Sequence, residues 1–297
     1  MRGARRDRLG KLAASLPGPA QTLVRLGYVA ARVTQGPRSF ATYVRLSRIH
    51  HHEGSRGRIV RMRLRPLGGR AMLIRPSTSD VDTVWGAFAG RYHRPPPEVA
   101  ADARLIWDLG ANIGLTMADL AERHREARIV GLEMDPENAA MARANVEPWG
   151  ARCEVIEAAA WPRDGELRYV RLAGATAGHH VTDAPLDADP AVASTDALSP
   201  YSLLALTGPA STVDYAKVDI EGAERSLLRE NAGWARRVRT IAVEVHEPYT
   251  VEECRADLEA LGFETRVDPR HWACVIGVRA PADPGESTLP VPSATSE

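Results

Sequence analysis

Two hydrophobic periodicities alternate along most of the chain, and together they predict an α/β fold. From residue 103 onward, short apolar runs are followed by stretches in which apolar residues recur every third or fourth position. The first pattern is typical of buried strands, and the second is typical of helices that pack one face on a sheet. The predicted strands are residues 105–108, 128–133, 153–157, 213–219 and 240–246. The predicted helices are residues 114–124, 136–146, 223–230 and 250–261, the last opened by a Thr250-x-x-Glu253 capping box.

Hairpins are predicted at both ends of this pattern. Residues 58–64 alternate apolar and basic side chains, and residues 71–74 form a second short strand after a Gly68-Gly69 turn. At the other end, residues 263–267 and 272–278 are predicted to form an antiparallel hairpin at one edge of the sheet. Strands that alternate with helices form a mostly parallel sheet with both faces covered. We therefore expect a mostly parallel seven-stranded sheet with an antiparallel edge hairpin, the usual outline of the Rossmann-like class I methyltransferases.

The same pattern divides the chain into segments. They are, in order, a basic helical extension at residues 1–55, a hairpin and helix packed on the next domain at 56–100, the α/β domain at 101–280 and a disordered tail at 281–297. The extension contains a helical run over residues 20–33, and the helix of the second segment begins at Ser79-Asp80. Within the α/β domain, residues 173–200 are rich in Ala, Asp, Pro and Ser and interrupt the pattern. They are predicted to form a flexible or substrate-facing insertion.

Charge is distributed unevenly, although the chain as a whole carries 38 basic and 38 acidic residues. Through Arg75, 16 arginines and Lys11 face only Asp7 and Glu53, which gives +15 and leaves −15 for the rest of the chain. We interpret the basic section as an accessory that docks on the acidic domain, on an anionic membrane surface or on an anionic acceptor. It is not interpreted as a clue to the reaction.

Other compositional features exclude several classes of protein. Forty-four per cent apolar residues exclude a fibrous or wholly disordered chain. Three cysteines without metal-ligand spacing argue against a structural zinc site and favour a reducing compartment. No apolar run is long enough to span a membrane, and the apolar stretch near the N-terminus is too short for a signal peptide. We therefore expect a cytoplasmic protein, with peripheral membrane contact through the basic N-terminus left open.

The segment after the first predicted parallel strand reads Asp108-x-Gly110-x-Asn112-x-Gly114. Such a turn lets backbone approach a ligand closely and aims helix N–H groups at it. A dinucleotide site would prefer G-x-G-x-x-G, whereas an acid before the first glycine suits the ammonium of an amino acid. Glu133 follows 25 residues later at the end of the next strand, where a carboxylate can accept both ribose hydroxyls. Together these residues predict S-adenosylmethionine, with its amino acid near Asp108 and its ribose on Glu133.

The third predicted strand ends in Glu157 and Ala158, at the carboxyl edge of the sheet. A carboxylate beside small residues is suited to the adenine of the same cofactor, and we assign Glu157 and Ala158 to it. Packing of an alanine run, residues 158–160, remains the alternative.

A second charged segment, YAKVDIEGAE, places Lys217, Asp219 and Glu221 at the end of the fourth strand. Charged residues in an apolar strand are costly to bury unless they are paired. One interpretation is a structural ion pair between Lys217 and Glu224. We assign Asp219 to the site, because the carboxyl ends of the strands are where open α/β sheets bind ligands.

The next strand ends in Glu244-x-His246, two side chains on one face. His246 could take a proton from a hydroxyl nucleophile with an acid orienting it, or it could be a core or rim histidine. Together with Asp219 and Glu221 these residues could hold an oxygen-preferring ion. The spacing does not require one, and no metal ligand is assigned.

The sequence resembles the FkbM-type methyltransferases in the segments DLGANIG, GLEMDPEN, KVDIEGAE and EVHEPY, taken in this order and spacing. The segment IRPSTSD and the aromatic pair Phe88 and Tyr92 extend the resemblance to about residues 70–280. The resemblance implies S-adenosylmethionine-dependent O-methyl transfer, commonly to hydroxyls of sugars or secondary metabolites. By position it implies cofactor binding by Asp108, Gly110, Asn112, Gly114 and Glu133. It also implies an acceptor flanked by Lys217, Asp219, Glu221, Glu244 and His246. The insertion with His179-His180 departs from the family pattern and leaves the acceptor's identity open.

Two other functions are weighed against this prediction. A nucleic-acid methyltransferase is suggested by the basic N-terminal section and by His246-Glu247-Pro248-Tyr249. Enzymes that methylate base amines place an Asp/Asn-Pro-Pro-aromatic turn after the fourth strand to hold a flipped base. Here that strand ends in Asp-Ile-Glu-Gly, so we expect no nucleic-acid partner and a small-molecule or glycan hydroxyl as acceptor. A non-catalytic S-adenosylmethionine-binding module is disfavoured by the full set of acids on the acceptor side.

Overall fold

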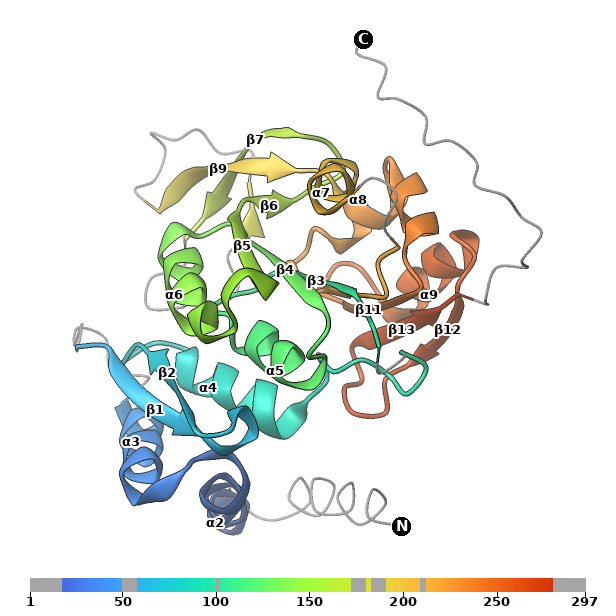
Figure 1. The fold of residues 1–297 in the computed structure, drawn as a ribbon. Helices are drawn as coiled ribbons and strands as arrows, with labels where there is room; N and C mark the ends of the chain where they lie inside the picture. Colours follow the sequence, from blue (N-terminus) through green and yellow to red (C-terminus); the bar gives the residue numbers. More distant parts are fainter. Residues whose placement is uncertain are drawn as a thin grey trace.

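A seven-stranded sheet lies at the centre of the molecule in the computed structural model, which describes residues 18–49, 58–99, 102–171, 180–182, 191–208 and 212–279 (Figure 1). The strand order is β12-β13-β11-β10-β3-β4-β5. The strands are β3 (Leu105–Leu109), β4 (Arg128–Glu133), β5 (Cys153–Glu157), β10 (Tyr215–Val218), β11 (Thr240–Glu244), β12 (Glu264–Val267) and β13 (Cys274–Val278). The mostly parallel sheet predicted from the alternating pattern is therefore confirmed.

The C-terminal hairpin closes one edge of this sheet, as predicted. Strands β5, β4, β3, β10 and β11 run parallel, whereas β13 pairs antiparallel with both β11 and β12. The antiparallel strand is therefore one position in from the edge, and β12 is outermost. The sequence explains this order, because β13 is apolar and almost fully buried while β12 carries Glu264 and Arg266 and is half-exposed. A polar, short strand suits a sheet edge.

Helices cover both faces of the sheet, because neighbouring strand residues point to opposite sides. Ile106 belongs to the core shared with α5 and α6, while Trp107 belongs to the core shared with α7, α8 and α9. The helices are α5 (Leu115–Arg123), α6 (Pro136–Val146), η4 (Glu147–Arg152), α7 (Pro200–Thr207), α8 (Glu224–Arg229), η5 (Ala232–Arg237) and α9 (Val251–Ala260). The predicted capping box of α9 is present, with Thr250 and Glu253 each bonded to the other's backbone.

An N-terminal layer packs on the α5–α6 face (Figure 1). Its elements are α2 (Gly18–Tyr28), η1 (Val29–Val33), α3 (Gly36–Ile49), β1 (Val60–Leu64), η2 (Arg65–Leu67), β2 (Arg70–Ile74), α4 (Asp80–Trp85) and η3 (Gly86–Gly90). The predicted β1–β2 hairpin is present, and Asn145 of α6 clamps it by bonding the backbone N and O of Leu73 at 2.6 and 3.1 Å. Helix α3 is not among the sequence predictions, although Tyr43 and Leu46 are buried one turn apart.

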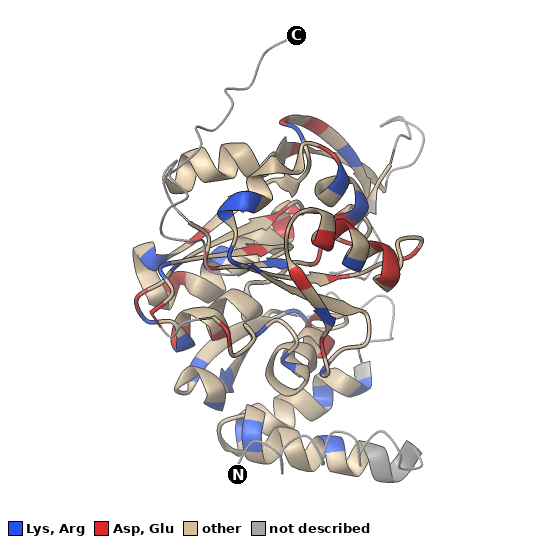
Figure 2. Ribbon diagram, turned by 90° about the vertical axis from the view of Figure 1, so that its right-hand side faces the viewer, with Lys and Arg blue, Asp and Glu red and all other residues tan. Residues whose placement is uncertain are grey.

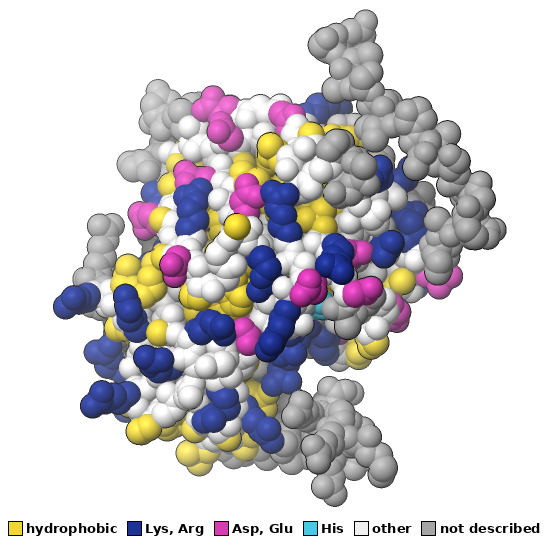
Figure 3. All heavy atoms as spheres, in the orientation of Figure 1, with side chains coloured by type: hydrophobic (Ala, Val, Ile, Leu, Met, Phe, Trp, Pro, Cys, Tyr) yellow, Lys and Arg dark blue, Asp and Glu magenta, His cyan; other side chains and the backbone are white. Residues whose placement is uncertain are grey.

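This N-terminal layer joins the main core through apolar contacts while its outer surface is basic. Tyr43, Met62 and Met72 are fully buried in the same cluster as Leu115 of α5. The described residues up to Ser79 contain eleven arginines and no acidic residue. The elements nearest the N-terminus accordingly carry blue but no red in Figure 2, and dark blue side chains cover the same region in Figure 3. Of the predicted docking modes, packing on the domain is the one that these contacts support.

A second sheet lies beside β5 and was not predicted. Its order is β6-β9-β7-β8, formed by Ala159–Ala160, Val192–Leu198, Gly165–Val170 and His180–Val181. Strand β9 falls inside the predicted insertion, residues 173–200, so that part of the stretch is regular strand. The strands are half-exposed, with weak alternation, which explains why the sequence pattern did not indicate them. His179 and the predicted tail at 281–297 lie outside the described residues, and the segment boundaries at 55 and 100 stay predictions. Among the described helices, none has the length and apolar content needed to cross a bilayer.

Candidate functional site

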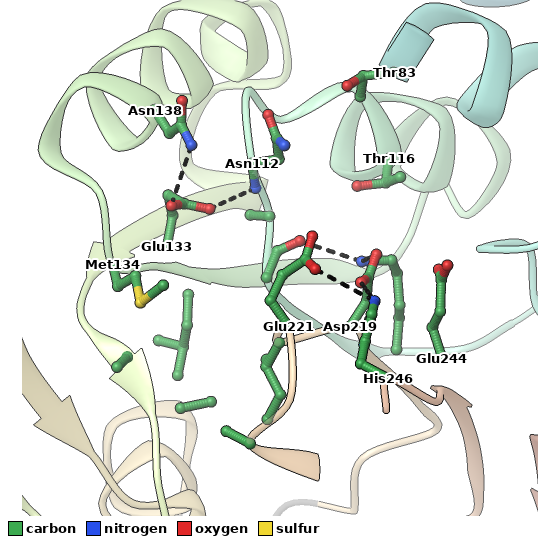
Figure 4. A pocket seen from close by; sticks show the side chains of 18 of the residues that line it. Thr83, Asn112, Thr116, Glu133, Met134, Asn138, Asp219, Glu221, Glu244 and His246 are labelled. Carbon is green, nitrogen blue, oxygen red and sulfur yellow. Dashed lines mark hydrogen bonds and ion pairs between the residues drawn. The ribbon is translucent and has the colours of Figure 1, made fainter. Parts of the chain in front are cut away.

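A cavity of about 310 Å³ opens at the carboxyl ends of β3, β4, β10 and β11 (Figure 4). This is the edge at which parallel α/β sheets bind ligands, because the strands end there and the following turns expose backbone groups. On the β3–β4 side the lining residues include Gly110, Asn112, Thr116, Glu133 and Ala158. On the β10–β11 side they are Lys217, Asp219, Ile220, Glu221, Ala223, Glu244 and His246. Ser79, Asp82, Thr83, Gly86 and Tyr92 complete the wall from the N-terminal layer.

The turn between β3 and α5 requires glycine at its first position. Gly110 has φ 85°, and a Cβ there would overlap the carbonyl oxygen of Asp219. Asn112 also has a positive φ, 49°, and its side-chain oxygen accepts from the backbone N of Ile113 at 2.7 Å. Asparagine tolerates this left-handed conformation better than most residues. The turn therefore presses against the end of β10 and fixes the distance between the two sides of the cavity.

Glu133 at the end of β4 is buried and held by three donors. The backbone N of Asn112 donates to Oε2 at 2.7 Å, and the backbone N of Asp135 donates to Oε1 at 2.9 Å. The side-chain amide of Asn138 donates to Oε1 at 3.4 Å. Burial raises the pKa of Glu133 to about 7, although these hydrogen bonds oppose the rise. Carboxylate oxygens have lone pairs to spare, so Glu133 can accept further donors from the cavity.

Asp108 does not line the cavity, although the sequence assigned it to direct contact with a ligand. Its side chain is fully buried behind the wall, where the hydroxyl of Thr116 donates to Oδ2 and the ammonium of Lys217 lies 3.1 Å from Oδ1. Thr116 and Lys217 do line the cavity. Asp108 is therefore in position to orient these two side chains rather than to touch a ligand itself.

Gly114 and Glu157 also lie away from the cavity wall. Gly114 has φ 77°, and a Cβ there would crowd Ala142, so it permits the close packing of α5 on α6. Glu157 is exposed and pairs with Arg143 at 3.2 Å, because its side chain points to the outer surface of β5. Its neighbour Ala158 lines the cavity. Of the two residues that were predicted to contact adenine, only Ala158 therefore lines the cavity.

Lys217 is the one Lys or Arg among the described residues that line the cavity, and it joins the two sides. Its ammonium lies 3.1 Å from Asp108 and 3.2 Å from Asp219, and it donates to the carbonyl of Gly110 at 3.2 Å. Burial alone would lower the pKa of Lys217, but the two carboxylates raise it well above its usual value. The structural pair with Glu224 that the sequence left open is not formed.

Glu224 instead pairs with His246. Its fully buried carboxylate lies 2.8 Å from Nδ1 of His246. The other ring nitrogen, Nε2, faces the opposite way and lies 3.4 Å from Glu221 and 3.8 Å from Asp219 (Figure 4). Partial burial would lower the pKa of His246, but these carboxylates, Glu224 first, raise it to about 9. All five residues assigned to the acceptor side are therefore brought together. Glu224, for which a pair with Lys217 was one open interpretation, supports His246 instead.

Glu244 and Tyr92 close the far end of the β10–β11 side. Burial, and then the charge of Asp219, raise the pKa of Glu244 to about 8. The same causes raise the pKa of Tyr92. The ring of Tyr92 packs on that of His271 with centroids 4.9 Å apart, and His271 lies 3.7 Å from Glu244. This corner joins the N-terminal layer to the C-terminal hairpin.

Several residues in the cavity wall or behind it were not predicted as site residues. Thr116 is the second residue of the helix that follows the glycine turn. Its contact with Asp108 could therefore have been inferred from the sequence. Val181 comes from the unpredicted second sheet. Arg75 reaches Asn138 at 2.6 Å while bonded to the buried carboxylate of Asp80, and so connects the N-terminal layer to the residue that supports Glu133. The last two contacts depend on tertiary packing and left no local signal.

Comparison with known proteins gives one family. The Methyltransferase FkbM domain matches residues 108–265, more than half of the chain. The comparison with curated proteins gives no match. Solved structures are similar at low sequence identity. Precorrin-6y C5,15-methyltransferase from Geobacter metallireducens GS-15 is 14% identical with a TM-score of 0.35, over 61% of this chain and 82% of its own.

Two further solved structures show the same level of similarity. Fibrillarin from Aeropyrum pernix, in complex with natively bound S-adenosyl-L-methionine, is 12% identical with a TM-score of 0.37, over 75% of this chain and 95% of its own. An O-methyltransferase family protein from Burkholderia thailandensis is 13% identical with a TM-score of 0.39, over 69% and 61%. The domain match covers the glycine turn, Glu133, Asp219 and His246 in one span. The chain therefore belongs to the FkbM methyltransferase family and is an S-adenosylmethionine-dependent methyltransferase.

Proposed function

We propose that this enzyme transfers the methyl group to a hydroxyl of a sugar, glycan, glycolipid or secondary metabolite. The observation that carries the proposal is the pairing of Asp219 with His246 in the cavity wall, across from Glu133. A hydroxyl is a weak nucleophile until its proton is removed, and a carboxylate and an imidazole are the groups that remove protons near neutral pH. Family membership and the resemblance noted above support the same acceptor class.

The β3–β4 side fits the cofactor. Glu133 would accept the ribose hydroxyls, the turn at Gly110 and Asn112 would approach the amino-acid part, and Ala158 would leave room for the adenine. The cation of Lys217 and the hydroxyl of Thr116, both oriented by buried Asp108, complete the wall between the two sides. When bound, S-adenosylmethionine supplies an electrophilic methyl on a sulfonium.

The β10–β11 side would then position the acceptor and take its proton. We propose that the hydroxyl lies beside Asp219 and His246, and that Asp219, or His246 in its unprotonated form, accepts its proton. The oxygen forms the new bond to the methyl carbon while the sulfur–methyl bond breaks and S-adenosylhomocysteine leaves. Glu224 orients the imidazole through Nδ1, so that Nε2 faces the cavity. Positioning and proton removal are the main tasks of the protein, because the cofactor already activates the methyl.

The electrostatics of the cavity disfavour a nucleic-acid acceptor. Asp219 and Glu221 line the β10–β11 side, and their charges repel a phosphate backbone. The arginine-rich surface lies on the N-terminal layer, with no acidic residue among the described residues up to Ser79. We propose that this surface is an accessory to the fold, with contact to an anionic membrane as its remaining functional interpretation.

A panel of glycan and polyketide hydroxyls tests the proposal. Purified full-length chain is incubated with methyl-labelled S-adenosylmethionine, and S-adenosylhomocysteine release and the methylated atom are both determined. We expect transfer to oxygen in at least one glycan or polyketide. Labelled methyl on carbon or nitrogen, or transfer to RNA or DNA with a steep salt dependence, would contradict it. Binding of S-adenosylhomocysteine without transfer to any acceptor would favour the non-catalytic alternative.

A further inference from the structure

We propose that Asp219, Glu221 and His246 form a binding site for one divalent cation of the Mg²⁺ or Mn²⁺ type. The inference deepens the proposed function, on which it rests only for the task that the cation would serve, the binding of the acceptor oxygen. The site itself is argued from the positions of the ligand atoms, from the orientation of His246 and from the charges around them.

One side-chain atom of each residue meets the others in a small space. The three ligand atoms lie within 4.8 Å of one another, with His246 Nε2 3.4 Å from Glu221 and 3.8 Å from Asp219. Neighbouring ligands of an octahedral ion at about 2.1 Å stand roughly 3 Å apart. Small movements of the Glu221 and Asp219 carboxylates toward Nε2 of His246 would therefore bring the three atoms to adjacent coordination positions. The remaining positions face the cavity.

The orientation of His246 is that of a metal ligand. Its Nδ1 is 2.8 Å from the fully buried carboxylate of Glu224, which is in position to accept a hydrogen bond from that nitrogen. Nε2 thereby points at the carboxylate oxygens of Glu221 and Asp219, an arrangement that favours a positive charge at this position, either the second proton of the ring or a bound cation. A carboxylate behind the distal nitrogen is the usual support of a histidine that binds a metal.

Glu224 also holds the second ligand in place. Its oxygens accept from the backbone N of Ile220 at 3.1 Å and from that of Gly222 at 3.0 Å, on either side of Glu221. Glu221 itself has φ 54°, a conformation that a non-glycine residue adopts only at some cost in energy. One buried carboxylate thus positions both the imidazole and the turn that carries the second candidate ligand.

The charge count leaves room for a cation. Among the described residues of this cluster, the carboxylates of Asp108, Asp219, Glu221 and Glu224 face two basic groups, Lys217 and His246. Glu244, whose pKa is raised to about 8, is left out of this count because it is mostly protonated near neutral pH. Lys217 is engaged with Asp108 and with Oδ2 of Asp219, which leaves Oδ1 of Asp219 directed at His246. Two carboxylates with one imidazole favour Mg²⁺ or Mn²⁺ over soft, thiolate-seeking metals.

A cation here gives the acceptor side a specific task. It would bind the hydroxyl oxygen beside the β3–β4 side and fix its position, a recognised role of metal ions in catalysis. It would also occupy the Nε2 lone pair, which leaves Asp219 as the proton acceptor of the proposed pair. The bonds made and broken in methyl transfer stay as described above.

Binding is measured directly with Mn²⁺, by the loss of the free-ion electron paramagnetic resonance signal on titration of the full-length chain. We expect one Mn²⁺ per chain, displaced by excess Mg²⁺. Glu221→Gln is expected to weaken the affinity at least tenfold. Glu247→Gln, which removes the same charge from an exposed residue next to His246, is expected to leave it within twofold. Binding of S-adenosylhomocysteine serves as the test of folding for both variants.

Absence of stoichiometric binding, or equal binding by both variants, overturns the proposal. If there is no cation site but methyl transfer proceeds in EDTA, the proposed function is retained, and a side chain removes the acceptor's proton without help from a metal ion. Stoichiometric binding lost in Glu221→Gln, together with transfer that stops in EDTA and returns with Mg²⁺ or Mn²⁺, supports both. Stoichiometric binding without transfer to any hydroxyl supports the cation site and contradicts the proposed function.

Discussion

On the β3–β4 side of the cavity, backbone groups and one buried carboxylate form the surface, whereas charged side chains crowd the β10–β11 side. Glu133 is the single acid in the first group and is bonded to the backbone of Asn112 and Asp135. On the other side Asp219, Glu221 and Glu244 stand beside Lys217 and His246. The two sides are built from the same strand–turn–helix units of one sheet.

The difference indicates how each side is adjusted to its ligand. A surface made of backbone and one fixed carboxylate suits a ligand of constant shape, because its donors and acceptors do not move. A cluster of coupled charges suits proton removal, because small changes of position alter each pKa. Removing a group from one side should therefore affect cofactor affinity, and removing a group from the other should affect turnover.

The largest effect is expected from Asp219→Asn. Loss of the proposed base, or of a ligand to the proposed cation, should lower kcat by about 10²- to 10⁴-fold. Lys217 keeps its partner Asp108, so folding and S-adenosylhomocysteine affinity should be preserved. Steady-state kinetics with saturating acceptor and calorimetric titration of S-adenosylhomocysteine separate the two. Near-wild-type turnover in both Asp219→Asn and His246→Ala would remove this pair from the mechanism.

A smaller effect, on cofactor affinity rather than on turnover, is expected from Glu133→Gln. The amide keeps the size of the side chain but loses the charge that accepts donors, so the Kd for S-adenosylhomocysteine should rise about 10- to 100-fold. Turnover at saturating cofactor should recover. Glu157→Gln is the matched control, because Glu157 is the register partner of Glu133 on β5 but lies outside the cavity. An equal loss of affinity in both variants would contradict the assignment of Glu133.

All five residues that the sequence assigned to the β10–β11 side line the cavity, whereas Asp108, Gly114 and Glu157 of the β3–β4 side do not. Gly110, Asn112 and Glu133 follow strand ends directly, and parallel strands bring those ends to one edge, so their meeting is a local inference. Asp108 lies one layer behind the cavity wall rather than in it. In the pairing of β3 with β10, Asp108 lies opposite Lys217, and only this pairing shows that the two side chains meet behind the wall.

Long-range pairing also explains the other differences. A pair of Glu224 with Lys217 was one of two interpretations left open by the sequence, but the adjacency of β10 and β11 brings Glu224 to His246 instead. The second sheet depends on β7 pairing with β9, two half-exposed strands without clear alternation of buried and exposed residues, so no periodicity indicated it. Periodicity predicts elements, whereas the partners of charged residues depend on strand order.

The cofactor affinity of the β3–β4 side should also depend on pH. Burial raises the pKa of Glu133 to about 7, so free enzyme loses the negative charge as the pH falls below that value. Ribose hydroxyls donate to the ionised form, and the Kd for S-adenosylhomocysteine should therefore rise below pH 7, approaching about tenfold per pH unit. Above pH 7 it should be constant. Calorimetric titrations between pH 5.5 and pH 8 measure the slope, and Glu133→Gln should abolish it. A slope unchanged in the variant would assign it to another group.

The smallest effect is expected from Arg75→Lys in the N-terminal layer. Arg75 bonds Asp80 and reaches Asn138, which in turn donates to Glu133 at 3.4 Å. Lysine keeps the charge but cannot span both partners, because it lacks the planar fork of arginine. Glu133 retains its two backbone donors, so the Kd for S-adenosylhomocysteine should rise only about two- to fivefold, with kcat unchanged.

Arg70→Lys is the control for this last change, because Arg70 lies on the same hairpin but pairs with Glu122 of α5 at 2.8 Å, away from the cavity. It should leave the Kd unchanged. If Arg75→Lys lowers kcat instead of affinity, the N-terminal layer acts on the β10–β11 side through Tyr92. If neither constant changes, the layer contributes packing alone, and the Arg75–Asn138 contact does not support Glu133. A selective change in Kd would show that the basic layer, although it carries no group of the proposed reaction, helps to hold the one carboxylate on which the β3–β4 side depends.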